Sequence, residues 1–219
     1  MKNEKAIKLK VCGMRSSGNI LEVGSLSPDY MGFIFFQGSK RYVGDNFVIP
    51  PGFPPEIKRV GVFVNESTLE TIRLADKHHL HFIQLHGDEP ATQCEELKGK
   101  GFKVIKAFSV DHTFDFSTIQ NFKKVVDFFL FDTKGINYGG NGLAFDWDIL
   151  KMYDQEIPFF LSGGISEENI GNLSYLKGMN IHAIDINSRV EKAVGIKDAG
   201  LIEKIKSQVD HIRISKSTN

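Results

Sequence analysis

Cysteine, net charge and long hydrophobic stretches are all scarce in this sequence. Cys12 and Cys94 are its two cysteines, too few for a disulfide framework, and neither has neighbours at metal-ligand spacing. The 27 basic residues are balanced by 27 acidic ones, whereas a general nucleic-acid binder is usually basic. The longest apolar stretches, such as Phe128–Phe131, are far shorter than the ~18 residues of a membrane-spanning helix. We therefore expect neither a nucleic acid nor a membrane as a partner, while a small anionic substrate stays compatible with the neutral charge.

The segment Met1–Gly13 also lacks the apolar stretch of a secretory signal peptide. With so few cysteines, this predicts a cytoplasmic protein with reduced thiols. The 219 residues, 41% apolar and 25% charged, fit one globular domain of roughly 200–250 residues. We expect a single domain over residues 1–219 and no metal site, because His78, His79 and His81 have no carboxylates at ligand spacing. A neutral chain with 18 Phe fits either a monomer or a homodimer.

Eight short apolar runs recur along the chain, separated by longer segments of mixed polarity. Each run is nearly continuous rather than alternating, which is typical of strands covered on both faces in a parallel sheet. The runs are Ile7–Val11, Met31–Phe35, Val60–Val64, Phe82–Leu85, Val104–Phe108, Phe128–Phe131, Phe159–Leu161 and Ala183–Ile186. With helical connections, they predict an α/β fold, specifically a (β/α)₈ TIM barrel. A doubly wound open sheet, which usually has fewer strands, is the alternative.

Helical patterns lie between several of these runs. The segment Ser67–His79 opens with a capping box and places Leu69 and Ile72 at helical spacing. Residues 198–209 carry apolar side chains on one helical face. By contrast, four prolines lie within residues 45–58, so we expect the second helix of the barrel to be shortened.

In such a barrel, the residues that follow each strand line the active face. Cys12 follows the first run, and Asp132 follows the sixth. A thiol becomes a competent base when a nearby cation lowers its pKa, and a partly desolvated carboxyl can act as a general acid. The structural alternatives are a buried small hydrophobe for Cys12 and a loop-capping carboxylate for Asp132. Together, a thiol and an acid across the barrel mouth are typical of an acid–base isomerase that acts on a small sugar.

Four further polar residues follow or end predicted strands and are candidates for binding the substrate. Arg41 has the guanidinium fork that grips a carboxylate, although a solvated surface charge is usual for a Lys-Arg pair. Gln84 and His86 end the fourth run, where the histidine alternatively satisfies loop backbone groups. Asp185 lies inside the eighth run and is placed much as Asp132 is.

Small-residue turns concentrate in the last third of the chain. Backbone N–H groups of such turns bind anions readily, and barrels usually hold phosphate at the loops after strands seven and eight. The alternative is that the glycines only make tight turns. The predicted phosphate-binding residues are Gly140, Asn141, Gly142, Gly163, Gly164, Asn187, Ser188 and Arg189.

Taken together, these segments resemble the phosphoribosylanthranilate isomerase family. The resemblance spans nearly the whole chain in family order. The matching segments are Lys10–Met14, Gly32–Val43, Val60–Asn65, Ile83–Glu89, Phe131–Gly135, Gly139–Trp147, Leu161–Ile170, Ala183–Glu191 and Gly195–Asp198.

The resemblance implies a (β/α)₈ barrel, no cofactor and a small phosphorylated substrate. The implied reaction is the Amadori rearrangement of N-(5′-phosphoribosyl)anthranilate to 1-(2-carboxyphenylamino)-1-deoxyribulose 5-phosphate in tryptophan biosynthesis. The family's base falls on Cys12 and its acid on Asp132. Its arginine for the anthranilate carboxylate falls on Arg41, and its aspartate near the sugar hydroxyls falls on Asp185.

The chain departs from the family pattern at the phosphate loops. A family lysine is replaced by Leu143, and the usual Ser-Ser-Gly after strand eight is Asn187–Arg189 here. Arg189 offers a positive charge that compensates if it faces the phosphate. Two alternative functions stay open: the related isomerase of histidine biosynthesis, which uses two aspartates where this chain has Cys12 and Asp132, and a catalytically silent barrel that only binds phosphosugars. Retention of Cys12, Asp132 and Arg41 together argues against the silent barrel.

Overall fold

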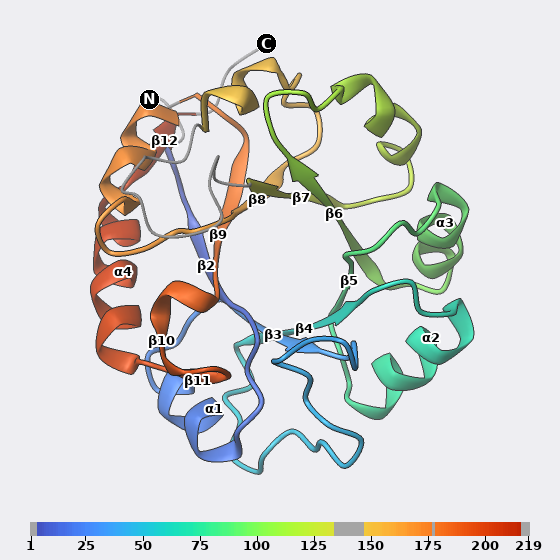
Figure 1. The fold of residues 1–219 in the computed structure, drawn as a ribbon, viewed down its shortest axis with the longest axis vertical. Coiled ribbons are helices and arrows are strands. Elements are labelled where there is room, and N and C mark those ends of the chain that lie inside the picture. Colours follow the sequence, from blue (N-terminus) through green and yellow to red (C-terminus); the bar gives the residue numbers. More distant parts are fainter. Residues whose placement is uncertain (1–3, 134–146, 177, 216–219) are drawn as a thin grey trace.

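The structure is a computed structural model that describes residues 4–133, 147–176 and 178–215. Eight parallel strands form a closed barrel in which neighbouring strands follow chain order and the last pairs with the first (Figure 1). They are β2 (Lys8–Val11), β3 (Tyr30–Ile34), β4 (Lys58–Phe63), β5 (Phe82–Leu85), β6 (Lys103–Val110), β7 (Phe128–Thr133), β8 (Phe159–Ser162) and β9 (Ile181–Ile186). The closed ring confirms the predicted barrel and excludes the open doubly wound sheet.

The barrel strands are buried on both faces, as their continuous apolar runs predict. The interior is filled by Tyr30, Val60, Ile105, Ala107, Leu130, Phe160 and Ala183. Alternate residues of the same strands, such as Met31 and Phe33 in β3, face outward and join the larger core beneath the surrounding helices. Parallel pairing then brings the carboxyl ends of all eight strands to one rim.

Helices surround the barrel (Figure 1). The α-helices are α1 (Ser17–Gly24), α2 (Thr68–Lys77), α3 (Ala91–Gly99) and α4 (Ala199–His211). Shorter 3₁₀-helices are η1 (Phe116–Phe122), η2 (Trp147–Met152), η3 (Ile170–Leu176) and η4 (Ser188–Val190). Across the described residues, no helix is both long and apolar enough to cross a membrane.

The helix predicted after Ser67 is confirmed, with one correction to its buried face. The Ser67 hydroxyl accepts a hydrogen bond from the Glu70 backbone N–H at 3.2 Å and caps α2. Leu69, however, is 80% exposed, and α2 instead buries Thr71 and Ala75. The apolar spacing did not identify the buried face of α2 at this position. Leu69 lies in the first turn, on the side of α2 that points away from the barrel.

The connection from β3 to β4 contains no helix at all. The prolines predicted to shorten a helix prevent one, and the loop covers the barrel with aromatic side chains instead. Phe47 and Phe53 from this loop pack on Phe33 of β3, with ring centroids 5.3 and 6.2 Å apart. In Figure 1 the loop runs along the lower edge of the ring.

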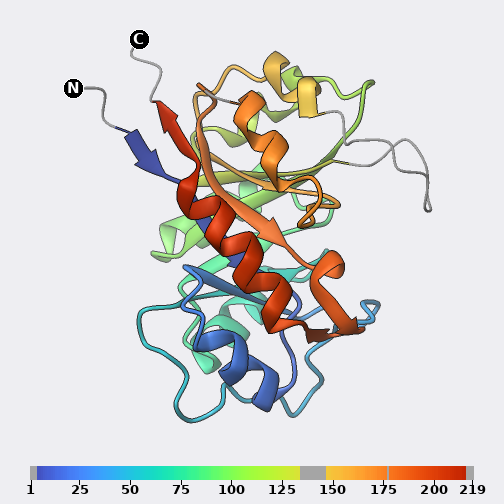
Figure 2. The same cartoon turned by 90° about the vertical axis from the view of Figure 1, so that its left-hand side faces the viewer.

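Two small antiparallel pairs complete the fold. β1 (Glu4–Ala6) pairs with β12 (Arg213–Ser215), next to the long helix α4 (Figure 2). β10 (Glu191–Ala193) pairs with β11 (Ile196–Lys197) in a hairpin that follows η4. This second hairpin supplies two charged residues to the barrel rim.

Candidate active site

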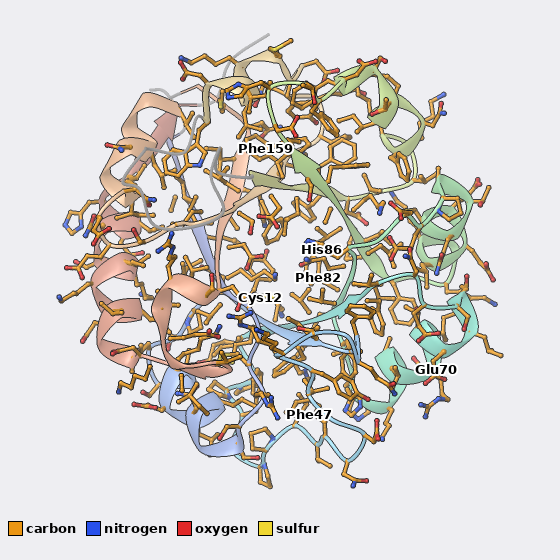
Figure 3. The ribbon with its side chains drawn as sticks, in the orientation of Figure 1. Cys12, Phe47, Glu70, Phe82, His86 and Phe159 are labelled. Atoms are coloured by element: carbon orange, nitrogen blue, oxygen red, sulfur yellow. The ribbon has the colours of Figure 1, made fainter. Side chains whose placement is uncertain are left out.

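Cys12 directly follows β2 and belongs to the inner wall of the barrel. Its side chain is 4% exposed and packs with Ile34 and Val62. Its backbone N–H donates to the carbonyl of Ile186 at 2.9 Å, which continues the pairing of β2 with β9. A Cβ atom on Gly32 would lie 2.7 Å from Sγ, so the glycine in β3 provides the space that the thiol occupies. Figure 3 shows Cys12 and His86 in the central part of the barrel, whereas Phe47 and Glu70 lie in the surrounding layer.

Lys10 lies two residues before Cys12 and therefore faces the same interior. The Lys10 side chain is completely buried, and its Nζ donates to Gln84 Oε1 at 2.8 Å and to Asp185 Oδ2 at 2.9 Å. Burial raises the pKa of Cys12, and the Lys10 and Lys197 ammonium groups oppose that rise while Asp185 adds to it. Burial also raises the pKa of Asp185, against the effect of Lys10.

Gln84 connects this charged group to the opposite side of the mouth. Its amide nitrogen lies 2.7 Å from His86 Nδ1. Because Gln84 Oε1 accepts from Lys10, the amide nitrogen is the donor to His86, and neutral His86 carries its proton on Nε2. That Nε2 lies 3.8 Å from Asp132 Oδ2 at the end of β7. Asp132 is 36% exposed, so it faces the open mouth.

Arg41 already has a carboxylate partner within the chain. Its Nε and Nη2 donate to the two oxygens of Glu191 at 2.8 and 2.7 Å. Lys197 Nζ donates to Glu191 Oε1 at 2.7 Å and also to the Asn187 backbone and side-chain oxygens. Burial alone would raise the pKa of Glu191, but the bonds from Arg41 and Lys197 lower it to about 2. Glu191 thus holds the guanidinium at the rim through Nε and Nη2.

A small cavity of about 130 Å³ opens at the ends of β7, β8 and β9. The residues around it are Asp132, Ser162, Gly163, Gly164, Ile165, Asp185, Asn187, Ser188 and Arg189. Gly163 and Gly164 have φ of 103° and 61°, which residues with a side chain rarely adopt. Arg189 is exposed and forms part of the wall. The structure therefore brings five of the predicted phosphate-binding residues together, while Gly140, Asn141, Gly142 and Leu143 lie outside the described residues.

Asp185 also borders this cavity, and one of its oxygens is free. Oδ2 is held by Lys10, whereas Oδ1 is buried and has no hydrogen-bond partner among the described residues. A buried acceptor without a partner is costly, so a donor from a bound molecule would stabilise it. Within the described ranges, no group of three or more His, Cys, Asp or Glu side chains is placed to hold a metal ion.

Sequence reasoning missed Lys10, Glu191 and Lys197. Lys10 was detectable, because residues two apart in a strand share a face and the interior of a barrel strongly disfavours an unpaired ammonium. The pairing of Glu191 with Arg41 joins residues 150 positions apart and has no local signal.

A closed parallel barrel with a thiol, carboxylates and a histidine at its carboxyl-terminal rim defines a (β/α)₈-barrel enzyme of the acid–base class. The family model described as N-(5'phosphoribosyl)anthranilate (PRA) isomerase matches residues 9–208. An N-(5'-phosphoribosyl)anthranilate isomerase from Phocaeicola vulgatus is 41% identical over 201 residues, covering 92% of this chain and 97% of the relative. One from Parabacteroides distasonis is 39% identical over 213 residues, covering 93% and 92%. The chain belongs to the N-(5'-phosphoribosyl)anthranilate isomerase family.

Solved structures agree with this placement. The phosphoribosyl anthranilate isomerase from Thermotoga maritima superposes with a TM-score of 0.83 at 32% identity, covering 94% of this chain and all of that one. A phosphoribosyl anthranilate isomerase in complex with reduced 1-(o-carboxyphenylamino)-1-deoxyribulose 5-phosphate gives a TM-score of 0.81 at 29% identity, with the same coverage.

Proposed function

We propose that this chain isomerises N-(5′-phosphoribosyl)anthranilate to 1-(2-carboxyphenylamino)-1-deoxyribulose 5-phosphate by general acid–base catalysis. Its family membership and the superposition on a relative that holds a reduced form of that product support the substrate class. The observation that carries the assignment is the placement of Cys12 and Asp132 at one rim, with Asp185 on β9, one of the two strands that separate β7 from β2 in the closed ring.

In the proposed mechanism, Asp132 donates its proton to the ring oxygen of the furanose. The C1′–O bond then breaks as the nitrogen lone pair forms a Schiff base, and the ring opens. The Cys12 thiolate removes the C2′ proton, and the electron pair neutralises the Schiff base to give an enolamine. The enolamine becomes the ketone when C1′ gains a proton and the 2′-hydroxyl loses one. Each proton-transfer group of this kind contributes roughly 10²–10⁴ to the rate.

The remaining residues bind and orient the substrate. Arg41 receives the anthranilate carboxylate on the edge that Glu191 leaves open. Asp185 Oδ1, which has no partner among the described residues, accepts a hydrogen bond from a sugar hydroxyl. Gly163, Gly164 and the Asn187–Arg189 turn hold the phosphate with backbone N–H groups, as small-residue turns do elsewhere. We also propose that the protein acts in the cytoplasm, in keeping with its two free cysteines.

The decisive experiment is an isomerase assay on the purified protein with substrate generated in situ, alongside the corresponding substrate of the histidine-pathway isomerase. We expect turnover of the anthranilate compound, and a loss of about 10²–10⁴ in kcat for both Cys12→Ser and Asp132→Asn with little change in KM. Turnover of the histidine-pathway compound alone would favour the sister enzyme. Binding without turnover of either compound would favour a silent barrel.

Wild-type kcat in Cys12→Ser would remove the thiol from the mechanism. A rise in KM alone in Asp132→Asn would make Asp132 a binding residue and leave the acid to another group.

A further inference from the structure

The interior of the barrel holds a lysine for which the proposed proton transfers give no role. Lys10 is completely buried, yet it carries a positive charge beneath the active mouth. A buried ammonium is costly, and a well-packed apolar residue of similar volume is often at least as stable as a buried ion pair. The stability of the fold therefore does not explain why a lysine lies at this depth.

The Lys10 ammonium donates hydrogen bonds to two other strands of the barrel. One N–H group donates to Asp185 on β9 and another to Gln84 on β5, at 2.9 and 2.8 Å. Lys10 also lies two residues before Cys12 on the same interior face, and its positive charge lowers the pKa of Cys12 against the rise that burial causes. Lys10 therefore holds Oδ2 of Asp185 and supports the thiolate form of Cys12.

The hydrogen bond to Gln84 extends the effect of Lys10 to His86. An amide can be turned either way, and the ammonium selects the orientation in which Oε1 faces Lys10. The amide N–H then donates to His86 Nδ1 at 2.7 Å, so that the ring presents Nε2–H toward Asp132. Without a cation at Lys10, nothing among these contacts prefers that orientation over the flipped one.

We infer that Lys10 is a positioning residue for both proton-transfer groups, because one ammonium supports the Cys12 thiolate and, through Gln84, sets the His86 tautomer that faces Asp132. This inference rests on the proposed function for its catalytic meaning. The two physical effects on the thiol and on the imidazole can be measured without any turnover.

The charged groups around Cys12 come from four places in the fold. Lys10 lies on β2, the strand that Cys12 follows. Asp185 lies on β9, Lys197 on β11, and Arg41 in the loop after β3. His86 and Asp132 act on Asp185 from β5 and β7. Ile34 and Val62, from β3 and β4, add only apolar surface. Removing Lys10 leaves Asp185 next to the thiol, so both the lost cation and the unbalanced carboxylate raise the pKa of Cys12.

The first measurement is the titration of the Cys12 thiolate by its ultraviolet absorbance, in a Cys94→Ser background with Cys12→Ser as the blank. In Lys10→Met we expect the pKa of Cys12 to rise by about 1–3, the range for the loss of a nearby opposite charge. Lys10→Arg should keep most of the parent value because it keeps the cation.

Lys106→Met is the matched control. Lys106 is 2% exposed and is also paired with a buried carboxylate, Glu89. It acts on Cys94 rather than on Cys12, so its removal should leave the Cys12 titration unchanged.

The second measurement is the pair of ¹⁵N ring signals of His86 by NMR. We expect a protonated Nε2 in the parent and a mixture of tautomers in Lys10→Met, with the parent pattern kept in Lys106→Met. If Lys10→Met does not fold, Lys10→Met/Asp185→Asn is compared with Asp185→Asn alone, and the same two differences are expected. The inference requires both changes, and the absence of either overturns it. Failure of the isomerase assay in the parent protein would refute the proposed function and leave both of these readouts valid.

Discussion

Gly32→Ala tests whether the space beside the Cys12 thiol is set by the absence of a side chain in β3. The added Cβ would lie 2.7 Å from Cys12 Sγ, 3.2 Å from its Cα and 3.3 Å from its Cβ. The Cα and Cβ atoms of Cys12 are fixed by the backbone, so a change of side-chain rotamer cannot move them away. The thiol would need to move by about 0.7 Å merely to reach an ordinary contact distance.

Two consequences follow from that displacement. Overpacking of a filled interior costs about 1–3 kcal/mol, which in a chain of this size lowers Tm by roughly 2–12 °C. A misplacement of about 1 Å at a reacting group costs about 10²-fold in rate. We therefore expect kcat to fall by about 10-fold or more, with a smaller effect on KM because Arg41 and the phosphate turns are untouched.

Thermal melts and the isomerase assay measure the two effects, with Gly18→Ala as the matched control. A methyl on Gly18 in α1 meets nothing within 4 Å in the described structure, so this variant should be as active as the parent and up to about 1 kcal/mol more stable. In a Cys12→Ala background the contact with Sγ is absent, and Gly32→Ala should cost less stability there. Equal Tm and kcat for Gly32→Ala and the parent would refute the steric argument.

Three further outcomes are expected. Arg41→Lys should weaken binding of a product analogue through its carboxylate but leave inorganic phosphate binding unchanged, because lysine lacks the bidentate fork; equal analogue affinity in titration calorimetry would contradict this. Glu191→Gln should lower Tm most above about pH 5 and progressively less as the pH falls toward 2. The pKa of Glu191 is lowered to about 2 in the folded state, so its stabilisation is complete above the unfolded pKa and is lost as the pH falls through the folded pKa. A pH-independent difference in melts would contradict the ion pair. Arg189→Gly should raise KM and its salt dependence if Arg189 faces the phosphate, as its place in the cavity wall indicates; an unchanged KM would leave the phosphate to the backbone amides.

The barrel strands were predictable because each is buried on both faces and is therefore apolar throughout. Phe82–Leu85 was predicted with its observed bounds, and β9 was found although it contains Asp185. The two small antiparallel pairs were not found, because β10 and β11 have only three and two residues and no distinct apolar pattern. The capping residues predicted α2. Its buried face depends on the side from which the barrel packs against it, and the sequence of the segment alone does not give that side.

The candidate site was predictable where a residue ends a strand and less so where partners come from distant parts of the chain. Cys12 and Asp132 lie at the rim because strand ends meet there. The position of Arg41 followed in the same way, but its bidentate pairing with Glu191 did not, because no local pattern relates the two. Lys10 was predictable as a site residue, because it lies two residues before Cys12 and residues two apart share one face of a strand.

The ion pair between Lys10 and Asp185 spans 175 positions of the chain, which has a consequence for biosynthesis. During translation the N-terminal strands emerge long before β9, and the ammonium has no carboxylate partner until the last barrel strand has left the ribosome. An incomplete barrel would enclose an uncompensated charge, so partial rings are disfavoured beyond their loss of apolar contacts. The ion pair thereby favours barrel closure only after the eighth strand is available.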